Sequence, residues 1–174
     1  LTRIEEGKLQ IEEIPIRLPS LIDDVTESYL LKCEAKNLNY KVCVDTDLPH
    51  LVLGDPTRLR QILTNLLDNA IKFTTSGNIE FHTHLKTQSP RNILLEIVVK
   101  DTGMGIQPKQ MATLFTPFTQ GEVGITQQFG GSGLGLAIVK ELLELMHGLI
   151  RVESTPSEGT EFILHIPLRR APEF

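Results

Sequence analysis

The sequence predicts one α/β domain, on the strength of its length and of two kinds of apolar periodicity. The chain has 174 residues, of which 40% are hydrophobic and 22% charged, enough to bury a core of its own. Several segments alternate apolar and polar residues, as half-buried strands do. Others repeat apolar residues at every third or fourth position, as helices packed on a sheet do.

Charge and cysteine content exclude several classes of function. The formal net charge is −5 and no Lys/Arg cluster occurs, so we expect no nucleic acid or anionic membrane surface as a partner. Cys33 and Cys43 lack the spacing of a zinc site or a disulfide framework, and we expect buried thiols in a reducing compartment. No apolar run approaches the roughly 20 residues that span a bilayer, which predicts a soluble chain.

The first residues predict a helix end, a strand and a packing helix. Segment 1–7 begins without Met and in mid-pattern, so we expect a fragment of a longer protein and the tail of a preceding helix. Residues 8–14 alternate as a short strand before Pro15. From 20 to 36 apolar residues recur at helical spacing, with Ser20 as the expected N-cap.

The middle of the chain predicts a long helix between short strands. Residues 40–44 and 51–53 are the expected strands before it. Asp55 is a good N-cap. Pro56 suits the first helical turn, because a backbone N–H at that position would have no partner within the helix and proline has none. We expect this helix to run to about Phe73.

The remaining elements alternate with loops. Residues 79–85 and 93–99 predict an antiparallel pair of strands. A helix from about 134 to 146 and strands at 149–153 and 160–166 are expected near the end of the chain. Between them, glycines crowd a stretch of about 35 residues, which is typical of backbone that is mobile or shaped around a ligand.

Polar residues on the long helix are the first candidates for a site. Asn65, Asn69 and Lys72 are spaced by four and three residues and share one face. They are ordinary solvent-facing residues or, because asparagine is a poor helix former, side chains needed elsewhere. An amide oxygen suits Mg²⁺, and a lysine ammonium suits a phosphate.

Two glycine-rich segments are the next candidates. Asp101 follows an apolar strand and precedes Gly103 and Gly105, so it is either an Asx-type turn residue or a carboxylate that accepts from an exocyclic amine. Residues 130–135 run into a helix, where backbone N–H groups favour an anion, although such turns also occur without ligands. Neither a P-loop nor a G-x-G-x-x-G motif is present, so a nucleotide would bind in another way.

Taken together, these segments resemble the N, G1, F and G2 boxes of sensor histidine kinases, in the same order and spacing. The boxes are Asn65-Leu-Leu-Asp-Asn69-Ala-Ile-Lys72-Phe-Thr74, Asp101-Thr-Gly-Met-Gly105, Phe115-Thr-Pro-Phe118 and Gly131-Ser-Gly-Leu-Gly135. The resemblance covers almost the whole chain. It implies the Bergerat (GHKL) fold, a two-layer α/β sandwich with a mixed, mostly antiparallel sheet covered on one face by helices, and a flexible ATP lid.

The resemblance also implies a division of the chain. Residues 1–7 would be the tail of the dimerisation and phosphoacceptor helix, and 8–170 the catalytic ATP-binding domain with a lid at about 106–132. Residues 171–174 would be a linker or a cloning remnant. The style of the N box resembles hybrid kinases, in which a receiver domain follows.

Individual roles carry over to the residues that match the boxes. Catalysis would rest on Asn65 and Lys72, and Asn69 would bind Mg²⁺. Asp101 would accept from the adenine amine, and Phe115 and Phe118 would pack the lid down. The ATP-binding residues implied are Asn65, Asn69, Lys72, Phe73, Asp101, Gly103, Gly105, Ile106, Phe118, Gly131, Ser132, Gly133, Leu134, Gly135 and Thr160.

The implied activity is transfer of the γ-phosphoryl group of ATP to a histidine. ATPases of the same fold carry a water-activating glutamate where this chain has Asn65, and a carboxamide does not accept a proton at neutral pH. The acceptor would lie on another domain, because none of the five histidines has the expected context. His82 and His84 are expected to face solvent rather than to bind metal, and His147 to cap the end of its helix.

The implied partners are a dimerisation domain and a response-regulator receiver domain. The parent protein would be a membrane-associated homodimer, with this domain on the cytoplasmic side of an inner membrane. Two alternatives remain open: a degenerate nucleotide-binding scaffold and a GHKL ATPase.

Overall fold

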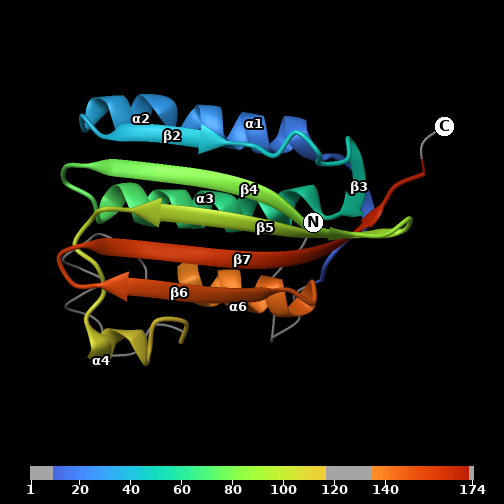
Figure 1. Ribbon diagram of the computed structural model, residues 1–174. Coiled ribbons are helices and arrows are strands. Elements are labelled where there is room, and N and C mark those ends of the chain that lie inside the picture. Colours follow the sequence, from blue (N-terminus) through green and yellow to red (C-terminus); the bar gives the residue numbers. More distant parts are fainter. Residues whose placement is uncertain (1–9, 117–134, 173–174) are drawn as a thin grey trace.

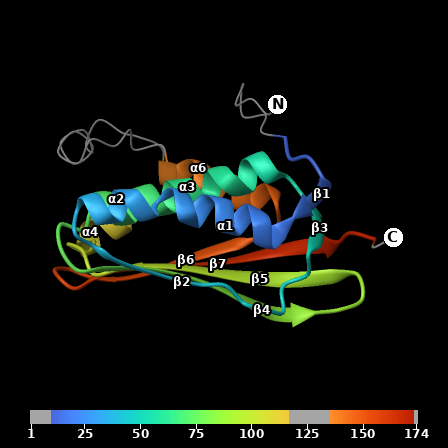
Figure 2. The same ribbon diagram turned by 90° about the horizontal axis from the view of Figure 1, so that it is seen from above.

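Two layers make up the fold, one mixed β-sheet and a set of helices on one of its faces (Figures 1 and 2). The computed structural model describes residues 10–116 and 135–172. The strands are β1 (Ile14–Arg17), β2 (Asn39–Cys43), β3 (Leu51–Gly54), β4 (Asn78–Gln88), β5 (Asn92–Asp101), β6 (Leu149–Thr155) and β7 (Gly159–Arg170). The helices are α1 (Leu18–Ser28), α2 (Leu30–Ala35), α3 (Pro56–Lys72), α4 (Pro108–Met111) and α6 (Gly135–Leu145).

The seven-stranded sheet has the order β1-β3-β7-β5-β4-β2, and β6 also pairs with β7. Only the β2–β4 pair is parallel, and the other pairs are antiparallel. Strand β7 is long enough to pair with β6 along its first half and with β3 at its last residues. The two-layer α/β sandwich with a mostly antiparallel sheet is therefore confirmed.

The core lies between the helices and the sheet face that they cover (Figure 2). Alternate residues of β4 and β5 are buried there, and the apolar face of α3 lies against them. The fully buried side chains with the largest volumes are Phe81, Leu18, Ile22, Leu59, Ile62, Leu63, Leu66, Leu67, Ile79, Leu95, Ile97 and Leu142. Each stabilises the fold by about 1.5–3 kcal/mol relative to an exposed side chain.

The long helix begins and ends almost as its sequence predicts. The Asp55 side chain accepts a hydrogen bond from the backbone N–H of Arg58, and Pro56 occupies the first turn. The helix ends at Lys72, with Phe73 as the C-cap. This places the Asn65, Asn69 and Lys72 face at one end of the sheet.

The predicted helix at 20–36 is instead two helices, and Ser20 is not its N-cap. Helix α1 begins two residues earlier, after Arg17, and no side chain caps it. The break falls at Tyr29, after the hydroxyls of Thr26 and Ser28 have bonded to backbone carbonyls of the preceding turn. Such local bonds compete with the helix and favour its interruption.

The predicted strand at 8–14 also lies elsewhere. Strand β1 begins at Ile14, and residues 10–13 form no strand. Pro15 therefore lies inside β1, which is at the edge of the sheet, where a missing N–H need not interrupt the hydrogen-bond ladder. The expected helix tail at 1–7 lies outside the described residues.

Helix α6 ends as predicted, with His147 in a left-handed conformation (φ 63°) and the Gly148 N–H bonded to the Leu143 carbonyl.

Phe115 packs against the core, and the Lys140 ammonium lies 5.7 Å from its ring centre. Most of the expected lid, including Phe118, lies outside the described residues.

Both cysteines are free thiols, Cys33 buried and Cys43 half-buried. His84 is exposed, whereas His82 is half-buried and its Nε2 lies 2.9 Å from a carboxylate oxygen of Glu80.

Among the described residues, no group of three or more His, Cys, Asp or Glu side chains is placed to hold a metal ion. No helix in the described part of the chain is long and apolar enough to cross a membrane.

The buried Asp55 carboxylate ties α3 to the segment before β1, and this predicts a graded loss of stability. One oxygen accepts from the Arg58 N–H (3.1 Å) and the other from the Glu12 N–H (2.9 Å). Asp55→Ala should lower the free energy of unfolding by about 1–3 kcal/mol, because both N–H groups lose their acceptor. Asp55→Asn keeps one acceptor and should lose less, as urea denaturation will measure. Equal losses in the two variants would contradict this account.

Candidate functional site

A row of polar side chains crosses the covered face of the sheet at the end where β5 finishes and β7 begins. Asp101 pairs with Ile79 on one side and with Thr160 on the other, and Thr160 pairs with Ser154 of β6. Directly paired residues project from the same face of a sheet, so these side chains form one line across four strands, which is polar on β5, β7 and β6 and apolar at Ile79 of β4. The neighbouring row is apolar throughout: Phe81, Val99, Phe162 and Val152.

Asp101 is the buried charge in this row, with only 5% of its surface exposed. Burial raises the pKa of its carboxyl group. The N–H groups of Gly103 and Thr160 oppose that rise, because they favour the charged form, whereas the buried hydroxyl of Thr74 makes no hydrogen bond within the described residues. The Gly103 N–H donates to a carboxylate oxygen at 2.9 Å. The carboxylate is thus partly stabilised and would gain from a further donor.

Three glycines allow the loops around this carboxylate to pack backbone against backbone. A Cβ on Gly103 would lie 2.3 Å from the Phe73 carbonyl oxygen, and one on Gly105 would lie 2.3 Å from that of Thr155. A Cβ on Gly159 would lie 2.1 Å from the Asp101 carbonyl oxygen. Gly105 and Gly159 also have positive φ angles, 72° and 137°. Any side chain at these positions would push the loops apart.

The C-terminal half of α3 supplies the second group of predicted residues. The Asn65 amide donates to the carbonyl of Gly135, the first residue of α6, at 3.3 Å. Asn69 is half-buried, and its amide has no hydrogen bond within the described residues. Lys72 is exposed, at the last turn of the helix. Within the described part of the chain, an amide and an ammonium group that form no hydrogen bond or ion pair thus follow one another along this face.

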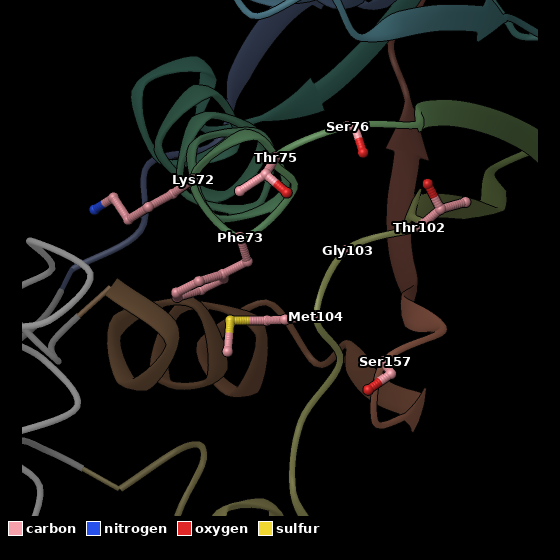
Figure 3. Close-up of a pocket in the computed structure, with 8 residues that line it drawn as sticks. All are labelled: Lys72, Phe73, Thr75, Ser76, Thr102, Gly103, Met104 and Ser157. Atoms are coloured by element: carbon pink, nitrogen blue, oxygen red, sulfur yellow. The ribbon is translucent and has the colours of Figure 1, made fainter.

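A pocket of about 270 Å³ opens beside the end of α3 (Figure 3). Its lining combines the end of α3, the loop after it, the loop after β5 and the β6–β7 turn. The lining residues are Lys72, Phe73, Thr75, Ser76, Thr102, Gly103, Met104 and Ser157. Figure 3 shows the Phe73 ring and the Met104 thioether next to each other, and the Met104 N–H donates to the Phe73 carbonyl. An aromatic ring and a thioether offer an apolar surface to a flat ligand.

The structure brings most of the predicted residues to one end of the molecule. Lys72, Phe73 and Gly103 line the pocket, whereas Asp101 and Thr160 are buried in the adjacent row and do not line it. Asn65 and Asn69 lie further up α3, outside the lining. Gly105 and Ile106 contact the β6–β7 hairpin. Gly131, Ser132, Gly133, Leu134 and Phe118 lie outside the described residues.

Two side chains at this site were missed by reasoning from the sequence. Thr74 is fully buried beside Asp101, and its position directly after the N-box helix was a signal. Ser154 is the polar residue that follows Ile150 and Val152 on the covered face of β6. A polar residue at a position where alternation predicts an apolar one is a second available signal.

Comparisons with known proteins agree with this geometry. The model of the family described as histidine kinase-, DNA gyrase B- and HSP90-like ATPase matches residues 54–170. The sensor protein GacS of Pseudomonas syringae is 42% identical over 172 residues, covering 99% of this chain and 19% of that protein. The histidine-protein kinase BarA of Escherichia coli is 39% identical, covering 98% of this chain and 19% of that protein. This chain therefore spans about a fifth of the length of those relatives.

Solved structures give the same answer. The crystal structure of full-length ShkA in complex with AMPPNP has a TM-score of 0.77 and 30% identity, covering 95% of this chain and 33% of that one. The mycobacterial sensor histidine kinase MprB has a TM-score of 0.68 and 27% identity, covering 91% of this chain and 99% of that one. By sequence and by fold, this chain belongs to the family of histidine kinase-, DNA gyrase B- and HSP90-like ATPases.

Proposed function

We propose that this domain binds Mg·ATP and transfers its γ-phosphoryl group to a histidine on a separate domain of a sensor kinase. The observation that carries the proposal is the buried Asp101 carboxylate at the end of the sheet, adjacent to the end of α3. An acceptor for an exocyclic amine and a run of amide and ammonium groups for phosphates thus lie at one end of the fold. The names of the relatives, sensor and histidine-protein kinases, support the choice of reaction.

In this proposal the base lies nearest the sheet. The Asp101 carboxylate accepts from the adenine amine, and Phe73 and Ile106 provide apolar contact. The Thr160 hydroxyl contacts the edge of the base that carries this amine. Because burial raises the pKa of Asp101, a new donor to its carboxylate would favour the charged form and would bind more strongly than at an exposed aspartate.

The phosphates would lie along α3 and toward the start of α6. Lys72 provides a positive charge there, and the resemblance implies that the glycines at 131, 133 and 135 would provide backbone N–H groups. The Asn69 amide oxygen, which has no hydrogen bond within the described residues, would hold Mg²⁺. A cluster of carboxylates is not required, because Mg²⁺ takes most of its remaining ligands from phosphates and water. When bound, the ion would neutralise charge on the phosphates.

Asn65 favours phosphotransfer over hydrolysis. Its amide donates to the Gly135 carbonyl, which holds α3 and α6 together, and it has no basic group with which to activate water. The domain's own residues would therefore position ATP and neutralise its charge, and the nucleophile would come from outside. This argues against a GHKL ATPase.

The expected partners lie outside this chain. We infer a dimerisation and phosphoacceptor domain on the same protein and a receiver domain of a response regulator. The hybrid signal transduction histidine kinase L of Dictyostelium discoideum, 40% identical over 163 residues, supports the hybrid arrangement; the match covers 93% of this chain and 10% of that protein. The domain would lie on the cytoplasmic side of a membrane-bound, homodimeric parent. A degenerate nucleotide-binding scaffold is the alternative that the first experiment separates.

Calorimetric titration tests the site directly. The protein should bind ATP saturably, with micromolar to millimolar affinity, and more tightly with Mg²⁺ than without it. GTP should give no saturable heat, because its base carries a carbonyl where adenine carries an amine. Absence of both heat and thermal stabilisation with ATP would favour the degenerate scaffold.

Asn69→Asp tests the metal ligand. The added charge changes the ligand set at the phosphates, so Mg²⁺-dependent enhancement of ATP affinity should be lost. Histidine phosphorylation, with the acceptor domain restored, should fall by at least about a hundredfold. Asn92→Asp is the matched control, because it makes the same chemical change at an exposed residue that begins β5, at the opposite end of that strand from Asp101. Normal phosphorylation by Asn69→Asp would refute the assignment.

Asp101→Asn tests recognition of the base. The amide keeps the shape but loses the charge, and ATP affinity should fall by about tenfold or more. The melting temperature should change little, because the buried carboxyl already has a raised pKa and a neutral group is easier to bury. For the same reason, ATP affinity of the unaltered protein should decline on acidification at a higher pH than an ordinary aspartate would give. A variant that unfolds, or that binds ATP normally, would contradict the assignment.

A further inference from the structure

The polar row ends on β6 with Ser154, whose hydroxyl oxygen has three partners. It lies 2.9 Å from the carbonyl oxygen of Gly159 and 2.9 Å from the hydroxyl oxygen of Thr160. It also accepts a hydrogen bond from the backbone N–H of Ile106, with 2.8 Å between the nitrogen and the hydroxyl oxygen. A serine hydroxyl has one hydrogen and two lone pairs, so these three contacts use its full capacity.

Counting hydrogens fixes the direction of each bond. The Ile106 N–H occupies one lone pair of Ser154, and the Gly159 carbonyl can only accept, so it takes the serine hydrogen. The remaining contact is then satisfied only if the Thr160 hydroxyl donates to Ser154. The reverse direction would leave the serine oxygen facing the Gly159 carbonyl oxygen with no hydrogen between them. Thr160 therefore keeps only lone pairs for any other partner.

We propose that Ser154 is a positioning residue that sets the base specificity of this site through Thr160. By holding the Thr160 hydrogen, it makes that hydroxyl an acceptor only, like the Asp101 carboxylate paired with it across β5 and β7. Two neighbouring acceptors fit a purine with an amine at position 6 and repel one with a carbonyl there. This inference rests on the proposed nucleotide site and adds to it the residue that fixes its hydrogen-bond polarity.

Ser154 is itself held in place from two sides. Its bond from Ile106 fixes the segment that follows Gly105, and a Cβ on Gly105 would meet the Thr155 carbonyl oxygen at 2.3 Å. Rotation of the Ser154 side chain would break the Ile106 bond and leave a half-buried N–H without its acceptor, and turning only its hydrogen toward Thr160 would break the bond to the Gly159 carbonyl. The direction of the Thr160 hydrogen is thus determined by the fold before any nucleotide arrives.

The test compares ATP with inosine triphosphate, which carries a carbonyl in place of the amine. In Ser154→Ala, the Thr160 hydrogen is free to turn toward the base. ATP should therefore bind more weakly and inosine triphosphate more tightly, and the ratio of their affinities should fall by about five- to tenfold. A purely structural role would weaken both nucleotides by the same factor and leave the ratio unchanged. Calorimetry on this chain, with Mg²⁺ present, measures the ATP affinity, and displacement of bound ATP measures the weaker affinity for inosine triphosphate.

Three further variants complete the test. Thr155→Ala removes a hydroxyl on the opposite face of β6, with no hydrogen bond within the described residues, and should leave the ratio unchanged. Ser154→Thr keeps the hydroxyl and should restore the ratio. Ser154→Cys replaces the hydroxyl with a thiol, a weaker donor and acceptor, and should give an intermediate ratio. This variant tests the role of Ser154 if the alanine variant does not fold.

The possible failures are distinguishable. An unaltered protein that binds neither nucleotide would overturn the proposed function itself. An unaltered protein that prefers ATP, with the same preference in Ser154→Ala or Ser154→Cys, would overturn only the role of Ser154.

Discussion

The register of β7 against its neighbours is the constraint on which the rest of this structure depends. β7 pairs with β3, β5 and β6, and it sets which side chain of each faces the helices. A slip of one residue would move Thr160 to the uncovered face and bring Glu161 under the helices, because side chains alternate along a strand. The apolar residues farther along β7 resist that slip, since their burial would be lost together. The core therefore positions the site.

A charged group at the edge of an apolar core is costly, and the surrounding loops show how the cost is limited. Asp101 lies one row beyond Val99 and Phe81, so the change from apolar to polar is complete within one step along the sheet. The loops after α3 and β5 and the β6–β7 turn converge there, and glycines let their backbones meet closely enough to direct N–H groups at the carboxylate. Pre-placed donors of this kind favour the charged form of the acid and so oppose the desolvation that raises its pKa.

Much of the fold could be predicted from the sequence, because its signals are local. The Asp55-Pro56 pair located the start of α3, and alternation located β4 and β5. The break at Tyr29 and the position of β1 could not be predicted, since the first depends on competing side-chain bonds and the second on pairing with β3, which is distant in sequence. The G1 motif identified Asp101, and the family resemblance implied Thr160 as a separate residue. Their union with Ser154 in one row required the registers of β5, β6 and β7, and no local pattern specifies these.

The placement of Pro15 inside β1 has a consequence for how this domain behaves among its own copies. An open sheet presents unpaired N–H and C=O groups at its edges, and these invite a strand from another molecule. At the β1 edge, Pro15 removes one of the donors that such a strand would need, and β1 is only four residues long. On the opposite edge, β2 carries a lysine at its centre, Lys41, which would have to lose water or meet another charge on contact. These two borders of the sheet are thus protected against edge-to-edge aggregation, which leaves β6, paired with β7 alone among the described strands, as the edge at which another strand could add.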